Sequence, residues 1–122
     1  MDNFINIARK ELTYKIYNLN MYVNDSVEKF LSGIYYCKAV ITNSFHATIF
    51  SIIFNKPFIT FRTNDDERLD SLKKSLYLNN RILEYTEIPD LNLLKNSPTI
   101  NETNLNSLKT KSFNYLKKNL NE

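Results

Sequence analysis

The apolar positions of this chain follow two patterns, helical spacing and short continuous runs. The segment DSVEKFLSGIYYC (25–37) has apolar side chains at i, i+3, i+4 and i+7, which predicts a helix with one buried face. Asp25, with Glu28 three residues later, resembles a capping box at its start. The apolar positions of this helix are Val27, Phe30, Leu31 and Ile34.

Two continuous runs, KAVITN (38–43) and KPFITF (56–61), are typical of strands that are buried on both faces. Between them, SFHATIFSIIFN (44–55) predicts a second helix, and DDERLDSLKKSLYL (65–78) predicts a third with acidic residues in its first turn. RILEY (81–85) predicts a weak strand. Strands that alternate with helices of this length indicate a parallel sheet with right-handed crossovers. We therefore expect an α/β fold, a Rossmann-like domain with a parallel sheet.

The two ends of the chain are less regular. MDNFINIARKEL (1–12) predicts a helix with no strand before it, as though the chain began midway through a β-α-β unit, and TYKIYNL (13–19) predicts a short strand. From about residue 101, the pattern predicts an amphipathic helix. Its inward positions are Leu105, Leu108, Leu116 and Leu120. Its lysines are Lys109, Lys111, Lys117 and Lys118. They allow a small nucleic-acid-binding module, but a solvated helix face explains them more simply, and we expect no nucleic-acid partner.

Composition sets limits on the protein class. With 122 residues, 43% hydrophobic and 24% charged, the chain has the size and make-up of one globular domain. The net charge of +3 is too small to indicate nucleic acid or a membrane surface. Cys37 is the only cysteine, which fits a reducing cytosol. The longest apolar run, IFSIIF, is far below the roughly 20 residues that cross a bilayer. No signal-peptide pattern opens the chain, so we expect a cytoplasmic protein without a transmembrane segment.

The single histidine, His46, lies where the predicted strand at 38–43 gives way to a helix. In an open parallel sheet, ligands bind outside the carboxyl ends of the strands, where loops lead into helix N-termini. Asn43 or Ser44 is expected to cap this helix. The free backbone N–H groups of its first turn, together with the helix dipole, favour an anion.

Steps of 100° place His46 on the side of its helix that carries Phe50 and Ile53. A polar stripe on another side consists of Thr48, Ser51 and Asn55. Because Cβ bonds tilt toward the helix N-terminus, we expect the imidazole to lean out over the strand ends. There it could contact a phosphate or carboxylate, or deliver a proton near neutral pH. The alternative is a packed, hydrogen-bonded core histidine.

Three arginines are further candidates for contact with an anion. Arg62 follows the strand at 56–61, so it lies at the carboxyl edge and could clamp an oxyanion; the alternative is a solvated loop side chain. Arg68 and Arg81 are individually expected to form surface pairs with nearby acids. Gly33, the only glycine, lies within a predicted helix, so the chain has no Walker loop and no GxGxxG motif. One histidine and one cysteine cannot build a usual zinc site, and we expect no metal and no cofactor.

A long ordered string carries a family resemblance. AVITNSFHATIFSIIFNKPFITF, followed by ERLDSLKKSLYLNNRIL, resembles the C-terminal half of polysaccharide pyruvyl transferases. The family pattern is a strand, then T-D/N-S-F-H-G/A-T-x-F-S, then N-K-P-F-I, then R-I/L-x-S-L-L and a later D/N-R. The resemblance covers residues 20 to 85 well and the ends loosely. Ala47 stands where glycine is commoner, a small-for-small change that still lets a ligand approach the backbone.

The resemblance implies a domain, spanning residues 1–122, like the C-terminal Rossmann-like domain of a GT-B fold, with the family's N-terminal domain absent. It implies transfer of a pyruvyl group from phosphoenolpyruvate, the donor substrate, to hydroxyls of a sugar in a cell-surface glycan or lipid-linked precursor. His46 matches the family histidine assigned to donor binding or catalysis. Asn43 and Ser44 match the loop before it, and Arg68 matches the arginine of the R-L-x-S-L segment.

This chemistry needs a proton at the methylene carbon of phosphoenolpyruvate, groups that hold its carboxylate and phosphate, and a base for the sugar hydroxyl. A histidine at a helix N-terminus can serve either of the first two needs. A second hypothesis is a half that is inactive alone and needs a separate chain carrying the N-terminal domain. Such a half should expose an apolar patch and self-associate. The inner face of the membrane is an alternative location.

Overall fold

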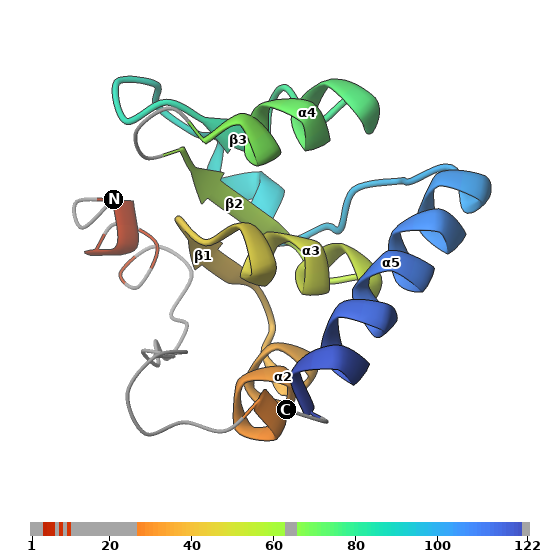
Figure 1. The fold of residues 1–122 in the computed structure, drawn as a ribbon. Coiled ribbons are helices and arrows are strands. Elements are labelled where there is room, and N and C mark those ends of the chain that lie inside the picture. Colours follow the sequence, from red (N-terminus) through yellow and green to blue (C-terminus); the bar gives the residue numbers. More distant parts are fainter. Residues whose placement is uncertain (1–3, 7, 9, 11–26, 63–65, 121–122) are drawn as a thin grey trace.

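The computed structural model describes residues 4–6, 8, 10, 27–62 and 66–120. Within these ranges, a three-stranded parallel sheet has the order β1-β2-β3. Its strands are β1 (Val40–Thr42), β2 (Phe58–Phe61) and β3 (Ile82–Leu83). The helices around it are α2 (Val27–Tyr36), α3 (Phe45–Ile53), α4 (Glu67–Ser75), the 3-10 helix η1 (Leu91–Leu94) and α5 (Glu102–Leu120) (Figure 1).

The predicted alternation of strands and helices is confirmed. Helix α3 connects β1 to β2, and α4 connects β2 to β3. The register aligns Thr42 with Thr60, and Thr60 with Ile82. The three strands within the described residues are shorter than predicted, and the weak strand at 81–85 is reduced to two residues. The predicted α/β architecture with a parallel sheet is therefore confirmed, and the carboxyl ends of the strands lie at one edge.

Helices cover both faces of this sheet. Successive side chains of a strand point to opposite faces, so Phe58 and Thr60 of β2 face one way and Ile59 and Phe61 the other. The first face packs against α2, α3 and α4, and its cluster includes Phe30, Ile34, Ile49, Phe50, Ile52, Ile53, Leu69, Leu72, Leu76 and Ile82. The second face contacts Phe4, Ala8, Leu83 and Leu94. Strand β2 is thus buried throughout, as its apolar sequence predicts.

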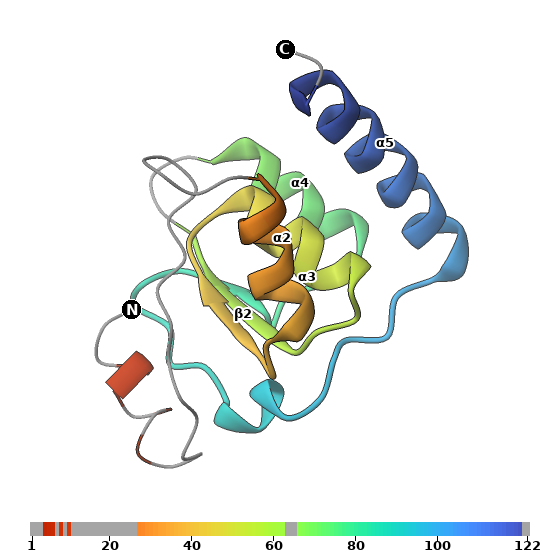
Figure 2. The ribbon, with the colours of Figure 1, turned by 90° about the horizontal axis from the view of Figure 1, so that it is seen from below.

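Helix α5 packs across α3, and α2 packs beside α3 (Figures 1 and 2). The predicted inward leucines Leu105, Leu108 and Leu116 contact the core cluster of the first face. Lys111, Lys117 and Lys118 are exposed on the outer side, as a solvated face requires. No helix among the described residues combines the length and the apolar character needed to cross a bilayer.

Arg81 corrects one prediction from the sequence. It was expected to form a surface pair, but it is only 5% exposed. Its Nη1 donates to the carbonyl oxygens of Phe58 (3.2 Å) and Leu93 (2.8 Å), and its Nη2 donates to that of Asn96 (2.6 Å). Burial lowers the pKa of this guanidinium. The side chain therefore joins the start of β3 to β2 and to the segment around η1.

Helices α3 and α4 end in the same way. Asn55 and Tyr77, which follow them, both have a φ of 56°, the left-handed region that favours glycine. The Lys56 N–H donates to the Ser51 carbonyl (2.8 Å), and the Leu78 N–H donates to that of Lys73 (2.9 Å). These bonds span five residues, as in a Schellman motif. Both helices are thereby closed just before the chain turns back toward the sheet.

Several predictions concern residues that are wholly or partly outside the described ranges. The strand at 13–19 and the capping residue Asp25 lie outside them, as does the side chain of Leu120. Of the helix predicted at 1–12, the described residues 4–6, 8 and 10 are helical.

The three hydrogen bonds of Arg81 yield a stability prediction. Arg81→Leu leaves three carbonyl oxygens without their donor, so we expect the free energy of unfolding to fall by about 3 kcal/mol. Urea denaturation followed by circular dichroism measures this loss. Arg68→Leu is the matched control, since the Arg68 side chain is 62% exposed and, among the residues described, its one ion pair is with Asp66 and its ring contact is with Phe45. Equal losses for the two variants would contradict the role of Arg81.

Candidate functional site

The junction between β1 and α3 is ordered by Ser44. Its Oγ accepts a hydrogen bond from the Ala47 N–H (3.3 Å), and its own N–H donates to Thr42 Oγ1 (3.0 Å). Asn43 lies in the preceding bend and is exposed. Of the two predicted caps, Ser44 is therefore the one that the structure shows.

The first turn of α3 keeps two backbone donors available. The Ala47 N–H donates to Ser44 Oγ and the Thr48 N–H to the Ser44 carbonyl (3.1 Å). Within the part of the chain that the structure describes, nothing accepts from the N–H groups of Phe45 and His46. Such groups at the positive end of the helix dipole are suited to an anion.

Two of the three residues of the polar stripe predicted on α3 lie in the core. Thr48 and Ser51 are both fully buried, and only Asn55 is exposed. Thr48 Oγ1 donates to the Ser44 carbonyl (2.8 Å) and lies 2.6 Å from Thr60 Oγ1 of β2. Because Thr48 has a single hydroxyl hydrogen, Thr60 must be the donor in the second contact. These small, satisfied hydroxyls let the helix lie close to the sheet.

The imidazole of His46 is contacted by two aromatic rings. It stacks on Tyr115 of α5, with 4.5 Å between ring centroids and 21° between planes. It meets Phe45 edge-on at 5.4 Å and 75°. No hydrogen bond to an imidazole nitrogen occurs among the residues that the structure describes. Burial, and then the charge of Arg68, lower the pKa of His46. In the free chain the neutral form is therefore favoured.

Arg68 lies near this group. Its guanidinium carbon is 4.7 Å from the centroid of the Phe45 ring, a cation–π geometry. Its Nε is 3.4 Å from Asp66 Oδ1, so the surface pair predicted for Arg68 is confirmed. The side chain is 62% exposed and retains access to solvent.

Arg62 follows β2 at the carboxyl edge, but its guanidinium is engaged by acids of this chain. Its Nε and Nη2 lie 2.6 and 2.9 Å from the two carboxylate oxygens of Asp70. Its Nη1 lies 3.1 Å from Glu84 Oε1. The side chain is 16% exposed, so a solvated loop arginine is not what the structure shows. Two carboxylates compensate its charge, and an incoming anion would compete with them.

The structure thus gathers Ser44, His46 and Arg68 around the start of α3, with Asn43 in the bend before it, and holds Arg62 against α4. Sequence reasoning missed Tyr115, which lies 69 positions after His46 and shares no motif with it. The described residues include no cluster of three or more His, Cys, Asp or Glu side chains arranged for a metal ion.

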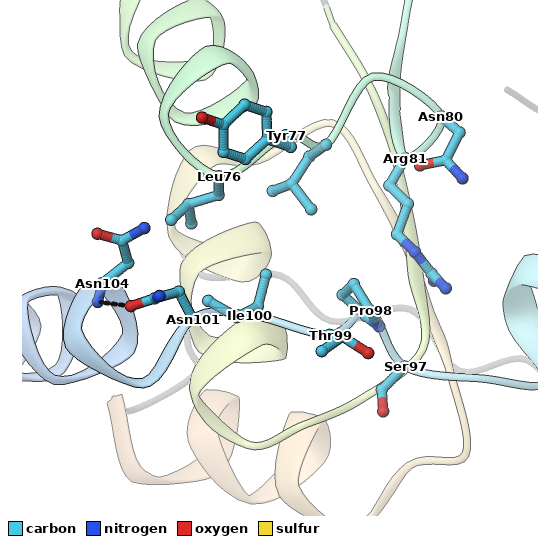
Figure 3. A pocket seen from close by; sticks show the side chains of 11 residues that line it. Leu76, Tyr77, Asn80, Arg81, Ser97, Pro98, Thr99, Ile100, Asn101 and Asn104 are labelled. Atoms are coloured by element: carbon cyan, nitrogen blue, oxygen red, sulfur yellow. Dashed lines mark hydrogen bonds between the residues drawn. The ribbon is translucent and has the colours of Figure 1, made fainter.

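A pocket of about 540 Å³ lies away from this junction (Figure 3). It is built by residues that precede β3 and by the segment that leads into α5, so it opens at the amino edge of the sheet. Polar lining comes from Asn80, Arg81, Ser97, Thr99, Asn101 and Asn104. None of the five predicted site residues lines it.

The comparison with protein families decides the assignment. The family model for polysaccharide pyruvyl transferases matches residues 1–65 of the 122-residue chain. The chain belongs to the polysaccharide pyruvyl transferase family. No curated protein and no solved structure matches it. The matched part contains Asn43, Ser44 and His46 of the pyruvyl transferase pattern, and also Arg62, which is not part of that pattern, whereas Arg68 lies beyond residue 65.

The lowered pKa of His46 makes stability depend on pH. Below pH 6.5, the ordinary pKa, the unfolded chain binds a proton that the folded chain resists, so unfolding becomes easier as pH falls. His46→Gln lacks this proton. We expect the variant to gain stability relative to wild type between pH 8 and pH 5, measured by urea denaturation. A difference that stays constant with pH would contradict the assignment.

The Thr48–Thr60 contact provides a second stability test. Thr48→Val leaves the buried Thr60 hydroxyl without a partner and should cost about 1–3 kcal/mol of unfolding free energy. Adding Thr60→Val removes the orphaned hydroxyl and should recover part of this loss. Thr110→Val is the control, because the Thr110 hydroxyl bonds only to its own exposed helix turn in the described structure. Losses that simply add in the double variant would show that the two hydroxyls are not coupled.

Proposed function

We propose that this chain acts in pyruvyl transfer from phosphoenolpyruvate to sugar hydroxyls of a glycan or lipid-linked precursor, with His46 at the donor site. The observation that supports this most is the place of the histidine. His46 lies within the segment that matches the family, in the first turn of α3, directly beyond the carboxyl end of β1. That edge is where open parallel sheets bind their ligands.

Two features of the site suit the negative charges of phosphoenolpyruvate. The N–H groups of Phe45 and His46 at the start of α3 can donate to a carboxylate or phosphate oxygen. Arg68 brings an exposed cation beside Phe45 and acts on the pKa of His46. Ser44 holds the turn in place, and Asn43 precedes it with its side chain exposed. Arg62 would contribute only in competition with Asp70 and Glu84.

The proposed chemistry starts with the protonation state of His46. The neutral imidazole of the free chain gains basicity when the donor brings its negative charges close, because a nearby anion raises a histidine pKa. The imidazolium then gives its proton to the methylene carbon C3 of phosphoenolpyruvate while a sugar hydroxyl forms a bond to C2. A second hydroxyl of the same sugar displaces phosphate from C2, which gives a ketal. Of the two hydroxyl protons, one replaces that of the imidazole and the other leaves with hydrogenphosphate.

A second candidate function is donor binding without transfer, in a half that needs another chain for the acceptor side of a GT-B cleft. Exposed apolar side chains at the same sheet edge favour it. Tyr85 and Ile88 follow the carboxyl end of β3 and are 51% and 95% exposed. Release of phosphate from phosphoenolpyruvate by the chain alone, in the presence of a glycan acceptor, would exclude this candidate.

Nuclear magnetic resonance of the only histidine tests the proposal directly. We expect added phosphoenolpyruvate to shift the Cε1–H and Cδ2–H signals of His46 and to raise its pKa. Calorimetry of His46→Gln should show binding weakened at least about tenfold, the loss of a charge-assisted hydrogen bond of roughly 1.5–3 kcal/mol.

Controls separate the donor from a simple anion. Inorganic phosphate and pyruvate each carry one part of phosphoenolpyruvate, so both should bind more weakly than the intact donor and compete with it. Arg68→Gln should weaken binding of phosphoenolpyruvate. The variant should remain folded, so the His46 signals of its free chain should differ from those of an unfolded peptide. Donor binding that is unchanged in His46→Gln, or absent from the folded wild type, would refute a donor site at His46.

A further inference from the structure

The orientation of the His46 ring needs an explanation that the family motif does not supply. Histidines that act on substrates are usually oriented through a hydrogen bond from one ring nitrogen to the protein. Here the described residues provide no such bond, and the ring is held between Tyr115 and Phe45. We propose that Tyr115 is a positioning residue that orients the imidazole of His46 toward the donor; this inference rests on the proposed function.

The position of Tyr115 is itself well fixed. The neighbouring residue Leu116 packs against the core cluster, as does Leu108 two turns earlier on α5. Ser112, between them on the same side of the helix, is 8% exposed. Because α5 is packed against the core along this side, the backbone of Tyr115 has a fixed position relative to α3, and its ring contacts His46.

Stacking is a contact that leaves the chemistry of an imidazole open. The proton and the lone pair of the ring nitrogens lie in the ring plane, whereas Tyr115 covers one face of the ring at 4.5 Å. Phe45 approaches at 75°, so it limits rotation about the side-chain bonds from another direction. The two aromatic contacts thereby hold the ring while both nitrogens stay available to phosphoenolpyruvate.

The charge around the ring supports this arrangement. The guanidinium carbon of Arg68 lies 4.7 Å from the centroid of the Phe45 ring, and so approaches the group from α4. The imidazole is thus bordered by α5 through Tyr115 and by α4 through Arg68. Both contributors lie beyond residue 65, where the match to the family model ends. On this proposal, the C-terminal helix α5 contributes Tyr115 to the site, and Tyr115 orients His46, a residue of the family motif.

The test compares three variants of α5 in the full chain. Tyr115→Leu removes the stacking ring, Tyr115→Phe keeps it, and Phe113→Leu removes another exposed aromatic from the same helix. Phe113 is 52% exposed and Tyr115 is 39% exposed, so the two positions are matched in type and accessibility. We expect Tyr115→Leu alone to move the His46 Cε1–H signal, since the ring current of the stacked aromatic is lost. Its affinity for phosphoenolpyruvate should fall about two- to tenfold, the value of one aromatic pair.

The outcomes separate the two proposals. Restoration of both the His46 signal and the affinity in Tyr115→Phe supports positioning by the ring. Circular dichroism of each variant would reveal a general loss of fold. A His46 signal that is unmoved in Tyr115→Leu overturns the role of Tyr115, as does a moved signal with unchanged donor affinity. If the wild type binds no phosphoenolpyruvate, the donor site at His46 is refuted. The proposed role of Tyr115 in orienting His46 toward the donor is then refuted as well, even if the His46 signal shows that the two rings are stacked.

Discussion

The rest of the fold depends on one buried cation. Strand β3 has two residues, too few to be held by its ladder with β2 alone, and the segment around η1 has no strand partner among the described residues. Arg81 stands at the start of β3 and donates to carbonyls in β2, η1 and the turn after it. Taking a guanidinium out of water is costly, and the carbonyls offset that cost because they would otherwise lack donors. The edge strand, the central strand and the 3-10 helix are thereby assembled as one unit.

A second polar contact sets the position of the site. Helix α3 packs on the sheet through apolar contacts. These contacts are non-directional, so alone they would permit the helix to shift along the sheet. The Thr48–Thr60 hydrogen bond is directional and joins the helix to the central strand. Thr48 also donates to the carbonyl of Ser44, the residue that caps the helix. The start of α3, and with it His46, is therefore fixed relative to the carboxyl ends of the strands.

Much of this could be read from the sequence. The continuous runs around Ile41 and Ile59 predicted parallel strands, the spacing of the α5 leucines predicted its buried side, and the T-N-S-F-H string predicted a capped helix at a strand end. These features are local, so the order of residues along the chain is enough to predict them.

The failures have a common physical cause. A buried arginine such as Arg81 is read as a surface residue because its partners are backbone carbonyls, which have no sequence signature. The sequence shows Thr48 and Ser51 only as part of a polar stripe, and it does not reveal that helix carbonyls and a threonine of the central strand bond to them in the core. Tyr115 reaches His46 only through the packing of α5 on α3. Each of these depends on contacts between segments that are far apart in the chain.

The left-handed residues that close α3 and α4 have a consequence for how the domain folds. The left-handed backbone conformation costs a residue with a Cβ on the order of 1 kcal/mol. Asparagine tolerates this conformation more readily than tyrosine does. Tyr77 does not itself favour this ending; the bond from the Leu78 N–H to the Lys73 carbonyl forms here while Leu76 and Leu78, on either side of Tyr77, are buried. The end of the helix and the beginning of β3 are thus properties of the assembled core. The α4–β3 unit should form together with the sheet, cooperatively, and not as a preformed piece that docks onto it.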